Sequence, residues 1–142
     1  MNHASNVERL NPPNMTFPGM SQAVGCGDFV LVSGQVALKD RQIVSIGDPA
    51  GQAEQAFRNI EAALAEAGLT LGHVVSLRCY LTSRDAYQAY ASVKNRIFAD
   101  HPPAATAVVV SELVLPELLV EVEAVAWRHA LADVFERRPR ER

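Results

Sequence analysis

The chain has 142 residues, of which 49% are hydrophobic and 20% are charged, and its formal net charge is −3. This length suits one domain, and the composition is that of a folded globular protein and not of a disordered one. The acidic balance argues against general binding to nucleic acid or anionic membranes, because both favour clustered Lys and Arg.

The N-terminal region is predicted to be an extended arm over residues 1–15, followed by a β-hairpin. Three prolines between residues 11 and 19 fix φ and favour extended backbone over helix. Turn residues at 25–28 join a short strand around Gln22 to a strong strand at 29–33. The Gly-x-Gly within this turn lacks the third glycine of a dinucleotide-binding loop and opens no helix, so we interpret it as turn chemistry.

A first helix is predicted to begin at Asp48 and Pro49, which suit the N-cap and the first helical position. Apolar residues then recur every three or four positions, and Gly68 is expected to end the helix. The predicted buried stripe is Ala53, Phe57, Ile60, Leu64 and Ala67. Gln52 is expected to lie off this stripe.

Residues 74–81 are rich in β-formers and predict a strand with two different faces. Val75, Leu77, Cys79 and Leu81 would share the apolar face; Ser76, Arg78 and Tyr80 would share the other. Ser83 is expected to cap a second helix, which His101 and the prolines after it end. The predicted buried stripe of this helix is Tyr87, Tyr90, Val93, Ile97 and Phe98.

Two further strands are predicted at 106–110 and 118–126, with Glu121 and Glu123 opposite the apolar face of the last one. The order hairpin, helix, strand, helix, two strands predicts an α+β sheet covered on one face by two helices. The other sheet face is half-polar, which suits a subunit interface or a cleft in a homo-oligomer. Residues 129–142 are expected to form a charged tail.

Targeting and metal-binding signals are missing from the sequence. The first ten residues are polar, and no apolar run approaches the roughly 20 residues that span a bilayer, so we expect a cytoplasmic protein without a membrane segment. Cys26 and Cys79 are too few for a disulfide framework, and we expect both to be reduced and packed. The four histidines have no metal-ligand spacing, so neither a metal nor a cofactor is predicted.

Several segments in the same order resemble the RidA (YjgF) family and together cover about residues 16–128. They are Ser-Gln-Ala-Val at 21–24, Val-Ser-Gly-Gln at 32–35, Gln-Ala-Phe-Arg-Asn-Ile at 55–60, Tyr-Leu-Thr at 80–82, Pro-Ala at 103–104 and Val-Glu-Val-Glu-Ala-Val-Ala at 120–126. The resemblance implies a chorismate-mutase-like α+β fold and a homotrimer with a central barrel and three sites between subunits. It also implies hydrolysis of enamines and imines, such as 2-aminoacrylate, to keto acids and ammonia.

The resemblance also implies residue roles, and this chain departs from some of them. The family places a carboxylate-binding arginine after Pro-Ala, where this chain has Ala105, so we expect a divergent subgroup that lacks the deaminase arginine. A water-orienting glutamate of the last strand matches Glu121. Met20 stands where the family has a tyrosine, and Ala91 where it has an asparagine. Losing one partner of a desolvated charge pair typically costs roughly 2–5 kcal/mol, so anionic substrates should bind poorly.

Other candidate ligand-binding residues keep a structural alternative. Ser33 and Gly34 end a strand and would line the cleft, although the glycine could simply relieve a bend. Thr106 carries the hydroxyl beside Ala105. Arg78 could replace the missing clamp or pair with Glu123 across the sheet, and Glu121 could orient water or form an interfacial ion pair.

Two hypotheses of function follow from these residues. One is a homotrimeric RidA-like protein that binds a small metabolite between subunits and hydrolyses enamines or imines. The other is a non-catalytic module that binds a ligand or stabilises another protein. Ribonuclease activity, reported for some relatives, fits poorly with the acidic charge and the absence of a basic, aromatic-lined groove.

Overall fold

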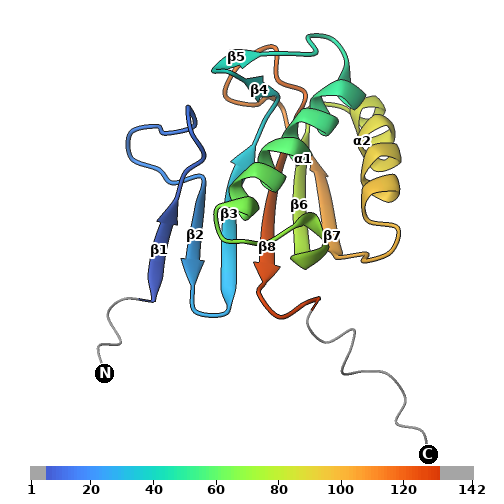
Figure 1. The fold of residues 1–142 in the computed structure, drawn as a ribbon. Coiled ribbons are helices and arrows are strands. Elements are labelled where there is room, and N and C mark those ends of the chain that lie inside the picture. The colour runs from blue at the N-terminus through green and yellow to red at the C-terminus, as the bar shows by residue number, and fades with distance from the viewer. Residues whose placement is uncertain (1–5, 132–142) are drawn as a thin grey trace, which may run out of the picture.

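The computed structural model describes residues 6–131, which form a mixed six-stranded sheet in the order β1-β2-β3-β8-β6-β7 (Figure 1). The elements are β1 (Val7–Leu10), β2 (Ala23–Cys26), β3 (Phe29–Gln35), β4 (Leu38–Lys39), β5 (Gln42–Ile43), α1 (Pro49–Ala65), a 3-10 turn (Leu71–His73), β6 (Val74–Leu81), α2 (Arg84–Ile97), β7 (Ala104–Val109) and β8 (Val120–Trp127). Only β6 and β7 pair in parallel, because α2 carries the chain across between them. The α+β prediction is confirmed.

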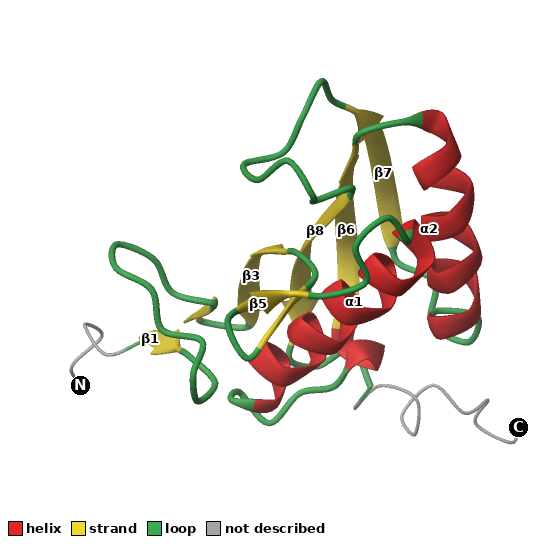
Figure 2. Cartoon of the chain, turned by 90° about the horizontal axis from the view of Figure 1, so that it is seen from above, coloured by secondary structure: helices red, strands yellow, loops and turns green. Residues whose placement is uncertain are grey.

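Both helices lie on the same side of the sheet, as the view from above shows (Figure 2). We call this side the helix face and the opposite side the open face. Side chains of a strand alternate between the two faces, and in β8 buried and half-buried residues alternate strictly. The strands therefore bury one face under α1 and α2 and leave the other uncovered by any helix among the described residues.

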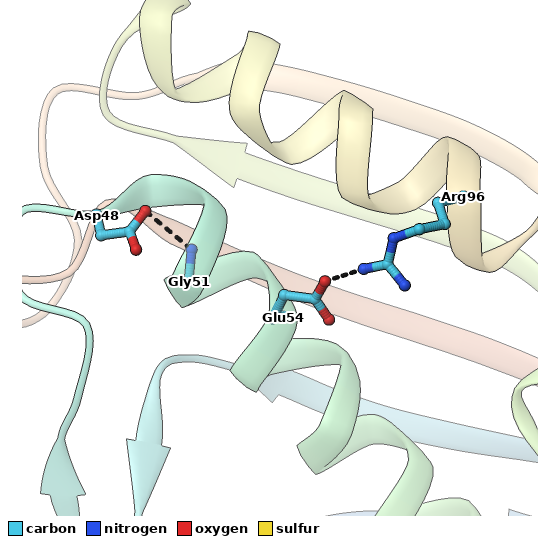
Figure 3. A network of polar contacts seen from close by, with 4 residues as sticks. All are labelled: Asp48, Gly51, Glu54 and Arg96. Carbon is cyan, nitrogen blue, oxygen red and sulfur yellow. Dashed lines mark hydrogen bonds and ion pairs between the residues drawn. The ribbon is translucent and has the colours of Figure 1, made fainter.

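The start of α1 follows the sequence prediction. The Asp48 carboxylate accepts a hydrogen bond of 3.0 Å from the Gly51 N–H, and Pro49 occupies the first turn, where its missing N–H costs nothing (Figure 3). At the other end Gly68 has a φ of +72°, the left-handed conformation that closes many helices.

The two helices pack against each other through an aromatic cluster and one surface ion pair. Phe57 of α1 stacks on Tyr90 and meets Phe98 edge-on, with centroid distances of 5.8 and 5.5 Å. On the surface Glu54 of α1 pairs with Arg96 of α2 (Figure 3). The α2 cap at Ser83 is confirmed by a 3.1 Å bond from the Ala86 N–H.

The packing also corrects some predictions. Gln52 is fully buried, because its amide donates to the Glu117 and Ser45 carbonyls and accepts from the Leu119 N–H. A register shift in β6 buries Val74 in place of Val75. Tyr87 is 42% exposed, since Ala86 takes the buried position.

The cysteines behave differently from each other. Both are free thiols; Cys79 is buried as predicted, whereas Cys26 is exposed at the end of β2, which contradicts the expectation that it is packed. Burial raises the pKa of the Cys79 thiol to about 12, so it is not a thiolate nucleophile at neutral pH.

The N-terminal segment contributes a strand that the sequence did not predict. Residues 7–10 pair with β2 as the antiparallel edge strand β1. Residues 1–5 of the expected arm and 132–142 of the expected tail lie outside the described residues. No helix in the described part of the chain has the length and apolarity needed to cross a membrane.

Candidate functional site

A polar cluster lies on the open face where β6 and β8 pair. Arg78 is opposite Glu123, and Tyr80 is opposite Glu121. The Tyr80 hydroxyl donates a short hydrogen bond to Glu123. Ion pairs among the described residues involve Arg96, Arg128 and His129, so neither Arg78 nor Glu121 is part of one. Arg78 and Glu123 are therefore register partners that form no ion pair within the described chain.

Glu121 lies directly over the backbone of Gly34. A Cβ added to Gly34 would come within 3.0 Å of the Glu121 Cδ and 3.2 Å of its Cγ. The backbone of Gly34 is not left-handed, so the close approach of the carboxylate, and not φ, requires glycine here. This contact holds the carboxylate against the strand end.

An open cavity of about 380 Å³ surrounds this carboxylate. We call it the Glu121 cavity. Its lining residues are Gly34, Tyr80, Val110, Glu112, Leu113, Val114, Glu121 and Glu123. It therefore carries three carboxylates and a phenol, and none of its lining residues is a cation.

The electrostatics of the Glu121 cavity favour the protonated forms of Glu121 and Tyr80. Burial raises the pKa of Glu121, and the nearby charge of Glu123 raises it further. The pKa of Tyr80 is also raised, first by its hydrogen bond to Glu123. A carboxylate whose pKa moves toward neutrality is suited to exchanging a proton with a bound water.

A second cavity, of about 190 Å³, also borders Gly34. We call it the Met20 cavity. It is lined by Met15, Phe17, Met20, Gln22, Gly34, Gln35, Val36, Leu38 and Asn59. The two cavities share Gly34. Ser33 lines neither of these two cavities within one chain, and its hydroxyl donates to the Ser21 carbonyl at 2.6 Å, which positions the strand end.

The remaining predicted residues lie elsewhere. Arg78 lines a neighbouring hollow of about 260 Å³ on the open face, and Thr106 is its register partner on β7. Ala105 pairs with the buried Leu77, so it points to the helix face, where it lines a hollow of about 170 Å³ beside α2. Within one chain, Ala105 and Glu121 do not share a cavity.

Sequence reasoning missed three polar groups of the site. The alternation of residues 74–81 places Tyr80 on the correct face but gives it no role. Gln22 and Gln35 enter the sequence analysis only as parts of the family-like segments. The signal for the glutamines is their position at equivalent ends of two strands predicted to pair. In the structure they touch, with the Gln35 amide donating to Gln22 at 2.8 Å. Among the described residues no group of His, Cys, Asp and Glu could hold a metal ion.

Comparison with known proteins gives consistent matches over most of the chain. The model of the family described as Endoribonuclease L-PSP matches residues 14–128. A RutC family protein of Pyrococcus abyssi is 36% identical over 110 residues, which cover 76% of this chain and 85% of the relative. The 2-iminobutanoate/2-iminopropanoate deaminase of Escherichia coli is 27% identical over 110 residues, which cover 75% of this chain and 85% of that enzyme.

Solved structures agree with the sequence matches. The crystal structure of a YjgF family member from Mycobacterium tuberculosis superposes with a TM-score of 0.73 at 35% sequence identity. The superposition covers 83% of this chain and 97% of that chain.

Proposed function

The chain belongs to the RidA (YjgF, Endoribonuclease L-PSP) family, and from that membership we propose that it binds a small neutral metabolite at Glu121 and hydrolyses its imine or enamine group. The observation that carries this proposal is the Glu121 carboxylate, held over the Gly34 backbone inside a cavity and with its pKa raised. A half-buried carboxylate in a cleft is suited to act as a general base.

The proposed chemistry needs one base and one water. Glu121 removes a proton from a water as its oxygen bonds to the imine carbon, and the electron pair of the C=N bond moves to nitrogen. The nitrogen takes the proton that Glu121 holds, which gives a carbinolamine. Glu121 then removes the proton of the new hydroxyl and passes it to the nitrogen, the C–N bond breaks, and ammonia leaves as the carbonyl forms. An enamine first becomes an imine when its carbon is protonated, which the acid form of Glu121 can supply because its pKa is raised.

The charge of the site supports a neutral substrate. The Glu121 cavity contains three carboxylates and no cation among its lining residues, so a substrate carboxylate would meet charges of its own sign. Ala105 stands where the resemblance places the carboxylate-binding arginine. We therefore assign the chain to a divergent subgroup whose substrates do not need that clamp, with Arg78 of the open face as the candidate replacement.

We propose that the active form is a homotrimer whose sites lie between subunits, built from the domain at residues 16–128. The open face supports this assembly, because it carries the exposed apolar side chains of Phe29 and Leu31, 47% and 48% exposed. Met20 and Thr106 would complete the clefts. Sedimentation equilibrium at micromolar concentration should give a trimer, and a monomer would contradict the assignment.

A non-catalytic binding module is the second candidate. The lack of a cationic residue in the lining of the Glu121 cavity favours it, because a site without a carboxylate clamp could bind a neutral effector and release it unchanged. In that case Glu121 would accept a hydrogen bond from the ligand and would not activate water.

The test compares Glu121→Gln with Glu61→Gln, a control at an exposed position of α1. The substrate is a neutral aldimine such as N-isobutylidenemethylamine, and the released aldehyde is measured. Glu121→Gln should lower the catalysed rate by about 10²- to 10⁴-fold, the usual contribution of a general base, with little change in KM. The control should match the wild type.

Two outcomes would redirect the assignment. If the wild type does not accelerate aldimine hydrolysis yet binds ligands, the binding module is correct. If it hydrolyses 2-iminobutanoate as fast as an arginine-bearing relative does, the argument from Ala105 is wrong, and Arg78→Ala should then abolish that activity.

A further inference from the structure

The Met20 cavity is a largely apolar space with three buried amides in its wall: Asn59, whose amide is bonded to Gln55, Val36 and Leu38, and the two glutamines Gln22 and Gln35. Met15, Phe17, Met20 and Leu38 supply its apolar surface, and Arg41 stacks over the Phe17 ring at 4.7 Å from its centroid. A cavity walled by methionine and phenylalanine adapts to aliphatic groups, because thioether chains repack at low cost.

The two glutamine amides are only partly satisfied by the protein. Gln22 and Gln35 are each 3% exposed. The Gln35 Nε2 donates to the Gln22 Oε1 at 2.8 Å and to the Ser33 carbonyl at 3.1 Å. The Gln22 NH₂ group and the Gln35 amide oxygen then have no partner among the described residues.

Neither of these two free atoms is sealed inside the protein. In the described residues the Tyr90 hydroxyl is the polar side-chain atom that is sealed without a partner. The free atoms of Gln22 and Gln35 are not sealed in this way, and both residues line the Met20 cavity. A donor and an acceptor are thus presented together within apolar walls, and buried groups of this kind are normally paired.

We propose that the Met20 cavity binds a neutral aliphatic group that carries a carbonyl next to an N–H, as in a lactam or amide. The carbonyl accepts from the Gln22 NH₂, and the N–H donates to the Gln35 oxygen. This inference rests on the proposed function in one respect: the group is the non-reacting end of the ligand whose imine carbon lies at Glu121.

Gly34 makes one continuous ligand possible, because it lines both cavities. It has no side chain to divide them, and Glu121 already fills the space that a Cβ would take. The two cavities share Gly34, and the Glu121 carboxylate packs against it, so a ligand whose amide end lies among the apolar side chains of the Met20 cavity would have its reactive end beside that carboxylate.

The same atoms define what the cavity rejects. A carboxylate would turn one oxygen toward the Gln35 amide oxygen, and an ammonium group would leave the Gln35 oxygen satisfied but the Gln22 NH₂ without an acceptor. Either charge would also lose its hydration between apolar walls. A neutral amide satisfies both free atoms, and unpaired polar groups are what make such sites selective.

The experiment measures binding of δ-valerolactam by protein-observed NMR with the full-length protein. The side-chain NH₂ signals of Gln22 and Gln35 should shift as lactam is added. N-methylvalerolactam, which lacks the N–H, and valerate, which is an anion, should each bind at least tenfold more weakly.

A matched pair of tryptophan variants locates the site. Met20→Trp fills the cavity from its rim, where Met20 is 43% exposed, and should weaken lactam binding at least tenfold. Ile46→Trp is the control, because Ile46 is 68% exposed and lines neither cavity. Equal lactam affinity in both variants, or unshifted glutamine signals in the wild type, would overturn the proposal.

The result is separable from the proposed catalysis. Lactam binding that survives in Glu121→Gln, in a protein that hydrolyses no imine, would support the amide site and reject the enzyme. Aldimine hydrolysis without any lactam binding would reject the amide site and leave the enzyme standing.

Discussion

The helix face and the open face of the sheet are built from the same strands but differ in burial and in the kind of side chain they carry. On β6, Leu77 is 1% exposed beneath the helices, whereas its neighbour Arg78 points to the open face. On β8, Val122 is buried, and Glu121 beside it is half-buried under a cavity. On the helix face the residue types are those that pack under the helices. On the open face they include polar groups that a ligand or another subunit would contact.

Buried polar groups show the difference most clearly. Gln52 on the helix side has its amide fully occupied by three backbone groups. The Glu121 carboxylate on the open side has no ion-pair partner among the described residues, and its pKa is raised. A satisfied polar group stabilises the fold, whereas an unsatisfied one is available for chemistry.

The largest expected change in the free energy of unfolding comes from truncating a leucine on the helix face, compared with truncating a leucine on the open face. Leu77→Ala should lower the free energy of unfolding by about 2–5 kcal/mol, since it removes a buried side chain and leaves a cavity. Leu31→Ala should lower it by less than ~0.5 kcal/mol in a monomer, because Leu31 is 48% exposed. Urea unfolding followed by circular dichroism measures both.

The leucine comparison also tests assembly. If Leu31→Ala is costly and its cost grows with protein concentration, the open face is buried between copies in solution. If the two leucines cost the same at every concentration, the division into a packed face and an available face is wrong.

A smaller effect is expected at Gln52. Gln52→Leu keeps most of the volume but leaves the Leu119 N–H and the Glu117 carbonyl without their partner. The free energy of unfolding should fall by about 1–3 kcal/mol, the cost of unsatisfied buried polar groups. Gln88→Leu, at an exposed position of α2, is the control and should be nearly neutral. An equal cost for both would mean that the Gln52 bonds add nothing.

The fold was predictable because its signals are local. Capping residues, apolar periodicity and strand alternation predict both helices and the central strands, and the Asp48 and Ser83 caps form as predicted. The errors come from tertiary context. The amide of buried Gln52 is satisfied in part by the Glu117 carbonyl, which is 65 residues away in the sequence, and no periodicity rule contains that information. Strand β1 was missed because it has only four residues, of which two are charged, and because it gains its pairing only from β2.

The site was predictable only in part, because cavities depend on how distant segments meet. The motifs singled out Met20, Gly34 and Glu121, and the structure places these residues in the walls of two cavities that share Gly34. The sequence could not show that Ala105 points to the helix face or that the Ser33 hydroxyl is already bonded. Nor could it show the free amide atoms of Gln22 and Gln35, which follow from the geometry of one side-chain contact.

The smallest expected effect is on the pH dependence of stability at Glu121. Its folded-state pKa is raised, so at neutral pH the charged carboxylate destabilises the fold relative to an ordinary glutamate. That cost is fully present above the folded-state pKa, fades as pH falls through it, and is gone below the unfolded-state pKa. Glu121→Gln should therefore melt at a slightly higher temperature than the wild type at pH 7, with the difference shrinking toward pH 4.

Glu61→Gln should show no such trend, and thermal melts across this range measure both. A lower melting temperature for Glu121→Gln at pH 7 would mean that a cation pairs with the carboxylate in the assembled protein, and the open face would then serve stability in the same way that the helix face does.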